Sequence, residues 1–179
     1  MDYLIEVEEL DSILIKDLPG FLLEKQGLQL SKMTVSDLVF HRGKAIRCGN
    51  GVYLFREEQR PVYVGNCIAR NFVERIPAHF DVRKNGWFNS LLLSRIQEKE
   101  GRRVKEDKTD ENLEAAARYA FNNYNLLLIN FSTYDKDAMN RLELLMRLTL
   151  NPINKFKRKR LPEEKHSTPV REFIYIIER

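Results

Sequence analysis

The chain has 179 residues, of which 43% are hydrophobic and 31% are charged. This length suits a single domain, and the composition is too apolar for a disordered chain. Two cysteines, Cys48 and Cys67, are too few for a disulfide scaffold. We find no signal peptide and no run approaching the ~20 apolar residues of a spanning helix. We therefore expect a soluble protein of a reducing compartment, the cytoplasm.

Basic residues slightly outnumber acidic ones, with 30 Lys and Arg against 26 Asp and Glu and a net charge of +4. The clearest concentration of positive charge is the run at residues 155–160, which contains Phe156 among its cations. Such a run is either a solvated surface segment or a patch that follows a phosphate backbone. The candidate nucleic-acid contacts in this run are Lys155, Lys157, Arg158, Lys159 and Arg160.

The first 48 residues predict short helices or hairpin pieces and show no chemistry that we can identify. Gly49-Asn50-Gly51 is a strong turn signal, and the β-rich runs at 52–55 and 62–64 follow it. A short polar connection separates these two runs, so they predict an antiparallel hairpin.

The second half of the chain predicts several helices and one buried strand. Residues 72–85 favour a partly helical stretch with Pro77 in its first turn. Further helices are expected at 87–97 and 111–121, a charged loop at 101–110, and a buried strand at 124–131. Asp135 is a candidate cap for a helix that ends at Leu150, before Asn151-Pro152. Residues 170–177 predict an edge strand. We expect an α/β fold of the α+β kind, with a small mixed or antiparallel three-stranded sheet flanked by helices and a helical N-terminal extension.

Several kinds of site are disfavoured by the sequence. The three histidines, His41, His79 and His166, and the two cysteines show none of the paired spacings of zinc sites. The glycine pair at 49 and 51 precedes a strand, so it is not a phosphate-binding loop. No nucleophile elbow is present.

Other polar residues form a more informative pattern. Tyr53 and Tyr63 lie in the two predicted strands, where half-buried packing is the usual role of a tyrosine. Arg75 and His79 are four residues apart, so on a helix they share one face. Glu143 interrupts an apolar helical stripe, which makes it either the partner of an arginine or a ligand for magnesium.

Together these elements resemble the GIY-YIG endonuclease superfamily, most closely its restriction and homing branches. The resemblance rests on Gly51-Val-Tyr53, Tyr63-Val-Gly65, the later arginine and histidine, the helix bearing Glu143, and Pro152-Ile-Asn154. It implies a nuclease domain over residues 49–156, preceded by an extension (1–48) and followed by a basic tail (157–179).

The resemblance also implies roles for individual side chains in metal-dependent phosphodiester hydrolysis. Arg75 would bind phosphate, with Arg70 as the rival for this role because the spacing after Gly65 is longer than in the family. Glu143 would hold one Mg²⁺ (or Mn²⁺).

The remaining implied roles concern water and the fold of the site. Tyr53 would activate the attacking water once its pKa is lowered, and His79, titrating near pH 6–7, would accept or relay the proton. Tyr63 would position water or phosphate, and Asn154 would tie the helix end to the site.

The expected partner is therefore DNA, with a homodimer or a second binding orientation needed for double-strand cleavage. Two alternatives remain open: an inactive GIY-YIG-like module that binds nucleic acid or protein, and a non-nuclease α/β domain. The second alternative expects Glu143 to be paired with a side chain and to lie far from Tyr53.

Overall fold

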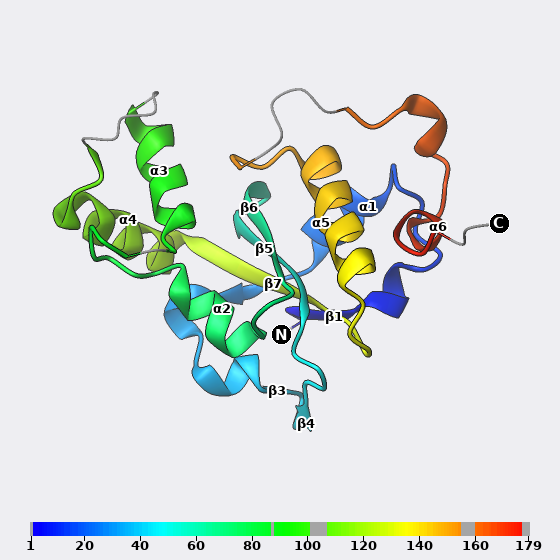
Figure 1. The fold of residues 1–179 in the computed structure, drawn as a ribbon, viewed down its shortest axis with the longest axis horizontal. Coiled ribbons are helices and arrows are strands. Elements are labelled where there is room, and N and C mark those ends of the chain that lie inside the picture. The colour runs from blue at the N-terminus through cyan, green and yellow to red at the C-terminus, as the bar shows by residue number, and fades with distance from the viewer. Residues whose placement is uncertain (1, 87, 101–106, 155–159, 177–179) are drawn as a thin grey trace.

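A computed structural model describes residues 2–86, 88–100, 107–154 and 160–176, and it shows a mixed sheet with helices packed on both faces (Figure 1). The strands are β1 (Leu4–Glu6), β2 (Leu28–Gln29), β3 (Phe40–His41), β4 (Lys44–Ala45), β5 (Gly51–Glu57), β6 (Arg60–Cys67) and β7 (Tyr124–Asn130). The α-helices are α1 (Leu18–Glu24), α2 (Phe72–Ala78), α3 (Ser90–Glu100), α4 (Asp110–Asn123), α5 (Lys136–Leu150) and α6 (Val170–Ile174). Single 3₁₀ turns occupy Val7–Leu10, Leu30–Lys32, Val35–Leu38 and Glu163–Lys165.

The main sheet has five strands, in the order β1-β7-β5-β6, with β2 also paired to β7. The predicted hairpin is confirmed as β5 and β6, and the predicted buried strand is confirmed as β7, which pairs antiparallel with β5. The expectation of three strands is wrong. The N-terminal segment supplies β1, which runs parallel to β7, and β2, so residues 4–6 and 28–29 are part of this sheet.

Alternation along the strands divides the core into two layers. Val52, Leu54 and Val64 face α1, α5 and α6 on one side of the sheet. Tyr53 and Tyr63 belong to the other layer, with the apolar residues of α2. This period of two follows from the strand geometry, and it places the two tyrosines on the same face. β6 lies at one edge of the sheet, which is where the two layers meet.

Gly51 is required by the close approach of β7. A Cβ at this position would lie 1.9 Å from the carbonyl oxygen of Ile129 and 3.2 Å from the ring of Phe72. A side chain at this position would push β5 away from β7 and from α2. This glycine of the motif therefore has a packing role.

The helices lie where the sequence predicts them, but some begin or end at other residues than predicted. The helix expected at 111–121 is α4, and Asp135 caps α5 by accepting a hydrogen bond from the Ala138 amide at 2.9 Å. The helix expected at 87–97 begins at Ser90 and runs to Glu100. The charged loop expected at 101–110 falls largely outside the described residues, and Asp110 already belongs to α4.

The C-terminal edge strand predicted at 170–177 is wrong, because Val170–Ile174 form α6. Val170 and Ile174 are buried against α5, four residues apart as on one helical face. The weak alternation in this segment therefore reflected a short amphipathic helix. None of the helices in the described ranges combines the length and apolar character needed to cross a bilayer.

Candidate active site

The two motif tyrosines lie side by side. Their rings are nearly parallel, at an interplanar angle of 10°, with centroids 6.4 Å apart. Gly65 creates the space for this arrangement: a Cβ there would lie 2.3 Å from the Tyr53 hydroxyl oxygen. The second motif glycine therefore lets the Tyr53 ring lie across β6 beside Tyr63.

Helix α2 brings Arg75 and His79 to this pair. Asn71 starts the helix by accepting a hydrogen bond from the Glu74 amide at 3.1 Å, and His79 is the residue that ends it. The prediction that Pro77 lies in the first turn is wrong, because Pro77 is next to the last residue of this seven-residue helix. The helix thus stops soon after its proline, with the amide of His79 bonded to the Ile76 carbonyl at 3.2 Å.

Tyr53 and His79 form a buried hydrogen-bonded pair. The Tyr53 hydroxyl lies 2.6 Å from Nε2 of His79, and neither side chain is exposed. Arg75 is close enough to lower the pKa of the Tyr53 hydroxyl. When the protonated phenol donates to His79, Nε2 is the acceptor and the imidazole carries its proton on Nδ1.

Burial dominates the protonation of both groups. It raises the pKa of Tyr53 well above 10, and the proximity of Tyr63 adds to this, while Arg75 acts in the opposite direction. Burial, followed by the positive charge of Arg75, lowers the pKa of His79 to about 3. The expectation that His79 titrates near pH 6–7 is therefore wrong. At neutral pH the imidazole is uncharged and can act as a proton acceptor.

Arg75 is held flat against an aromatic ring. Its guanidinium carbon lies 3.5 Å from the centroid of Phe88, and Phe88 also contacts the His79 ring, at 4.6 Å between centroids. Stacking of this kind fixes a guanidinium while leaving its edge for hydrogen bonds. Arg70, the rival arginine, is exposed and lies with Arg75 around a cavity of about 250 Å³.

Glu143 lies on α5, which packs on the opposite face of the sheet. One of its oxygens forms an ion pair of 3.0 Å with Arg147, one turn further along the helix. The other accepts a hydrogen bond from the side-chain amide of Asn66 on β6. Burial raises the pKa of Glu143, and Arg147, Asn66 and Arg75 act against that rise.

The tyrosine–histidine pair and the Glu143–Arg147 ion pair meet at the β6 edge of the sheet. Tyr63 is the link, since its pKa is raised by burial, lowered by Arg147 and Arg75, and raised by Glu143. Arg75 acts on the pKa of Tyr53 and of Glu143 alike. One cation thus influences the tyrosine–histidine pair and the carboxylate.

Asn154 closes the edge of β6. Its side chain accepts from the Val64 amide at 3.1 Å and donates to the Val64 carbonyl at 2.7 Å. These bonds satisfy outward-facing backbone groups of an edge strand and fix the segment that follows α5. The residue therefore has a structural role in tying the helix end to the sheet.

Sequence reasoning missed four residues of this site: Asn66, Phe88, Ser90 and Arg147. Arg147 had a readable signal, because it follows Glu143 by four residues on a helix. Asn66 follows the second motif glycine directly. Phe88 lies in the loop before α3 and Ser90, which lowers the pKa of Tyr63, is the first residue of α3; neither carries a sequence signal.

The donor set allows only a sparse metal site. Within the described ranges, no group of three or more His, Cys, Asp or Glu side chains could hold a metal ion. Glu143 is the one carboxylate among the predicted site residues. Mg²⁺ is commonly held by one or two carboxylates together with water and substrate phosphate, so a single half-buried carboxylate with an amide neighbour suits it.

The basic run is mostly outside the described residues, including Lys155, Lys157, Arg158 and Lys159. Arg160 is described and exposed. Comparison with known proteins gave no match to a family model, to a curated protein or to a solved structure. The case for function therefore rests on this chain's own residues.

Proposed function

We propose that the protein is a Mg²⁺-dependent endonuclease that hydrolyses phosphodiester bonds of DNA through a GIY-YIG-type site. The observation that carries the proposal is the convergence on Arg75. Tyr53 is hydrogen-bonded to neutral His79, and Tyr53, Tyr63 and Glu143 all lie within the electrostatic influence of the Arg75 guanidinium.

Arg75 is the residue best suited to the scissile phosphate. Its guanidinium is held by Phe88 before any substrate arrives, and it borders a cavity that Asn66 and Arg70 also line. A positioned cation stabilises the charge that gathers on phosphate oxygens in the transition state without reorganising. Arg70, exposed at the rim, is the better candidate for binding a neighbouring phosphate.

Glu143 would hold the metal, with Asn66 fixing the orientation of its carboxylate. The bound Mg²⁺ would stabilise negative charge on the leaving oxygen. Arg147 would have to yield part of its ion pair with Glu143, and it would keep its bonds to the Val64 carbonyl while adding positive charge near the phosphate.

Tyr53 and His79 form the proton path. The phenol would take the proton of the attacking water while passing its own to Nε2 of His79. At pH 7 a proton on an imidazole of pKa about 3 costs roughly 5 kcal/mol. Bound phosphate offsets the charge of Arg75 and raises the pKa of His79, so this path is favoured only with substrate in place.

Access to the site is through Tyr63 and Arg75. Tyr53 and His79 are fully buried, whereas Tyr63 retains a little exposed surface and Arg75 is half-buried. Phe88 contacts both Arg75 and His79. Tyr63, nearer to Glu143, would position the water or phosphate at the open side.

The test compares wild type with E143A in cleavage of supercoiled plasmid and in binding to duplex DNA. We expect E143A to lose cleavage by about 10³-fold or more while duplex binding changes little, because one carboxylate contributes to chemistry and not to affinity. Equal cleavage by E143A would contradict the metal role. Loss of binding with unchanged turnover of bound DNA would also contradict it.

A module that binds nucleic acid without cleaving it is the second candidate. The observation in its favour is that both oxygens of Glu143 already have protein partners, Arg147 and Asn66. A non-nuclease α/β domain is expected to pair Glu143 with a side chain and to place it far from Tyr53. The observed pairing meets the first of these two expectations. Mg²⁺-dependent turnover separates the nuclease from both alternatives.

A further inference from the structure

A second basic feature lies outside the candidate active site, on the small hairpin of β3 and β4. His41 pairs with Lys44, so Arg42 and Gly43 form a two-residue turn. Both have positive φ, 51° and 77°, the pattern of a type I′ turn. Such a turn is compact and holds the Arg42 side chain at a defined tip.

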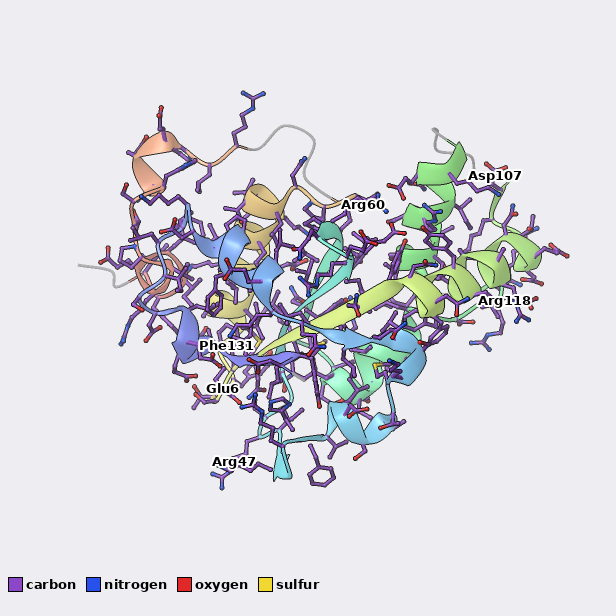
Figure 2. All side chains as sticks on the ribbon, turned by 180° about the vertical axis from the view of Figure 1, so that it is seen from behind. Glu6, Arg47, Arg60, Asp107, Arg118 and Phe131 are labelled. Carbon is purple, nitrogen blue, oxygen red and sulfur yellow. The ribbon has the colours of Figure 1, made fainter. Side chains whose placement is uncertain are left out.

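The hairpin exposes cations and an aromatic ring. The Arg42 side chain is 68% exposed and Phe40 is 49% exposed, while Lys44 and Arg47 are also exposed. The sequence has no Asp or Glu from residue 38 to residue 56. In Figure 2 the Arg47 side chain points away from the body of the protein.

The hairpin leads into the end of the sheet that bears the arginine cavity. The Asn50 side chain donates to the Cys67 carbonyl at 2.6 Å, and the Gly49 carbonyl accepts from the Phe72 amide at 2.8 Å. Cys67 lines the cavity with Arg70 and Arg75, and α2 begins at Phe72. The segment after the hairpin is therefore fastened directly to the wall of the cavity.

The spacing suits a DNA duplex. The hairpin ends at Ala45, five residues before Asn50, and five extended residues span at most about 18 Å. That span is about half of the ~34 Å turn of B-DNA. One duplex can thus contact both.

We propose that the β3–β4 hairpin with Arg47 is a second DNA-binding element, which grips the duplex backbone through Arg42, Lys44 and Arg47 while the cavity holds the scissile phosphate. Phe40 packs against the sugars or base edges of the groove between those phosphates. This inference takes DNA as the ligand from the proposed function, but it does not depend on DNA being cleaved.

Acidic residues lie near the base of the hairpin. Asp2, Glu6 and Glu9 line a pocket with Arg42 and Lys44, and Arg42 pairs with Asp2 at 3.3 Å. Both partners of that pair are solvent-exposed, so it is weak and can exchange for phosphate. Asp37 lines a second cavity with Phe40 and Arg42, so the exposed cations, and not one whole face of the hairpin, are what the proposal offers to DNA.

The test measures binding of a labelled mixed-sequence duplex at several salt concentrations in EDTA. The variant R42Q/K44Q/R47Q removes three exposed charges. The matched control K16Q/R118Q/K165Q removes three exposed charges elsewhere. Each lost phosphate contact lowers the slope of log affinity against log salt by about 0.9. We expect a drop of about 2–3 in the first variant and less than about 1 in the control. F40A should weaken binding at each salt concentration and leave the slope unchanged.

The outcomes separate this inference from the proposed function. A reduced slope in the hairpin variant supports the inference, whether or not wild type cleaves DNA. An unchanged slope, or an equal drop in the control, overturns it and leaves the nuclease proposal standing if wild type cleaves. A wild type that binds no duplex overturns both. Thermal melting of each variant within about 2 °C of wild type shows that the fold is retained.

Discussion

The candidate site has two halves that are held together by different forces. The half built on β5 and α2 is dry: Tyr53 and His79 are fully buried, hydrogen-bonded to each other and enclosed by aromatic rings. The half built on α5 is ionic and mostly buried, with Glu143 paired to Arg147. Burial shifts the pKa in both halves, and in the second half Arg147 and Asn66 act against that shift. We therefore expect substitutions in the dry half to affect both folding and chemistry, and those in the ionic half to affect chemistry alone.

After E143A, the largest expected effect is at Arg75, which connects the halves. R75A should slow cleavage by about 10²–10³-fold, because a positioned donor to the phosphate is lost. R75K should recover only part of the rate, since an ammonium group cannot form the planar fork. R70A is the matched control, with an expected loss below tenfold, roughly 1.4 kcal/mol. Single-turnover cleavage rates measure all three, and a larger loss in R70A would exchange the roles of the two arginines.

The two tyrosines should differ in the same way as the two halves. Y53F and Y63F should each slow cleavage by about 10²-fold if the hydroxyls handle protons. Only Y53F should also lower the free energy of unfolding, by about 1–3 kcal/mol, because it leaves Nε2 of His79 buried without a partner. Denaturant unfolding beside cleavage rates tests this, and a Y53F protein with unchanged rate would move the water-activating role to Tyr63.

The packing of the dry half is tested at its glycine. G65A places a methyl group 2.3 Å from the Tyr53 hydroxyl, and we expect a loss of about 1–3 kcal/mol in unfolding free energy. G20A, where no atom lies within 4 Å, is the matched control and should be neutral or slightly stabilising. Equal effects in the two variants would show that Tyr53 does not lie across β6.

His79 should make the stability of the fold depend on pH. Its pKa is about 3 in the folded protein and near 6.5 when unfolded, so below pH 6.5 the unfolded chain binds the extra proton. Stability should therefore fall with decreasing pH by up to about 1.4 kcal/mol per pH unit between these values. H79Q should lack this component. An identical pH dependence in wild type and H79Q would contradict a buried neutral imidazole.

The sequence predicted the parts of the fold that depend on local patterns. The hairpin of β5 and β6, the strand β7 and the capped helix α5 follow from alternation, turn residues and Asp135. It did not predict that β1 and β2 join the sheet, because their partners on β7 are about a hundred or more residues away along the chain. The site was likewise predicted only where local sequence patterns determine it. The motif tyrosines, Arg75 and His79 come together, but the burial that lowers the pKa of His79 involves Phe88, which the loop between α2 and α3 brings against its ring.

The most direct measurement is cleavage of supercoiled plasmid by wild-type protein with Mg²⁺ and with EDTA. We expect nicking or linearisation that requires Mg²⁺ and disappears in E143A. Mg²⁺-dependent cleavage that persists in E143A would contradict the assignment of the site. Duplex binding without any cleavage of plasmid, branched or single-stranded DNA would contradict the enzyme and leave a binding module.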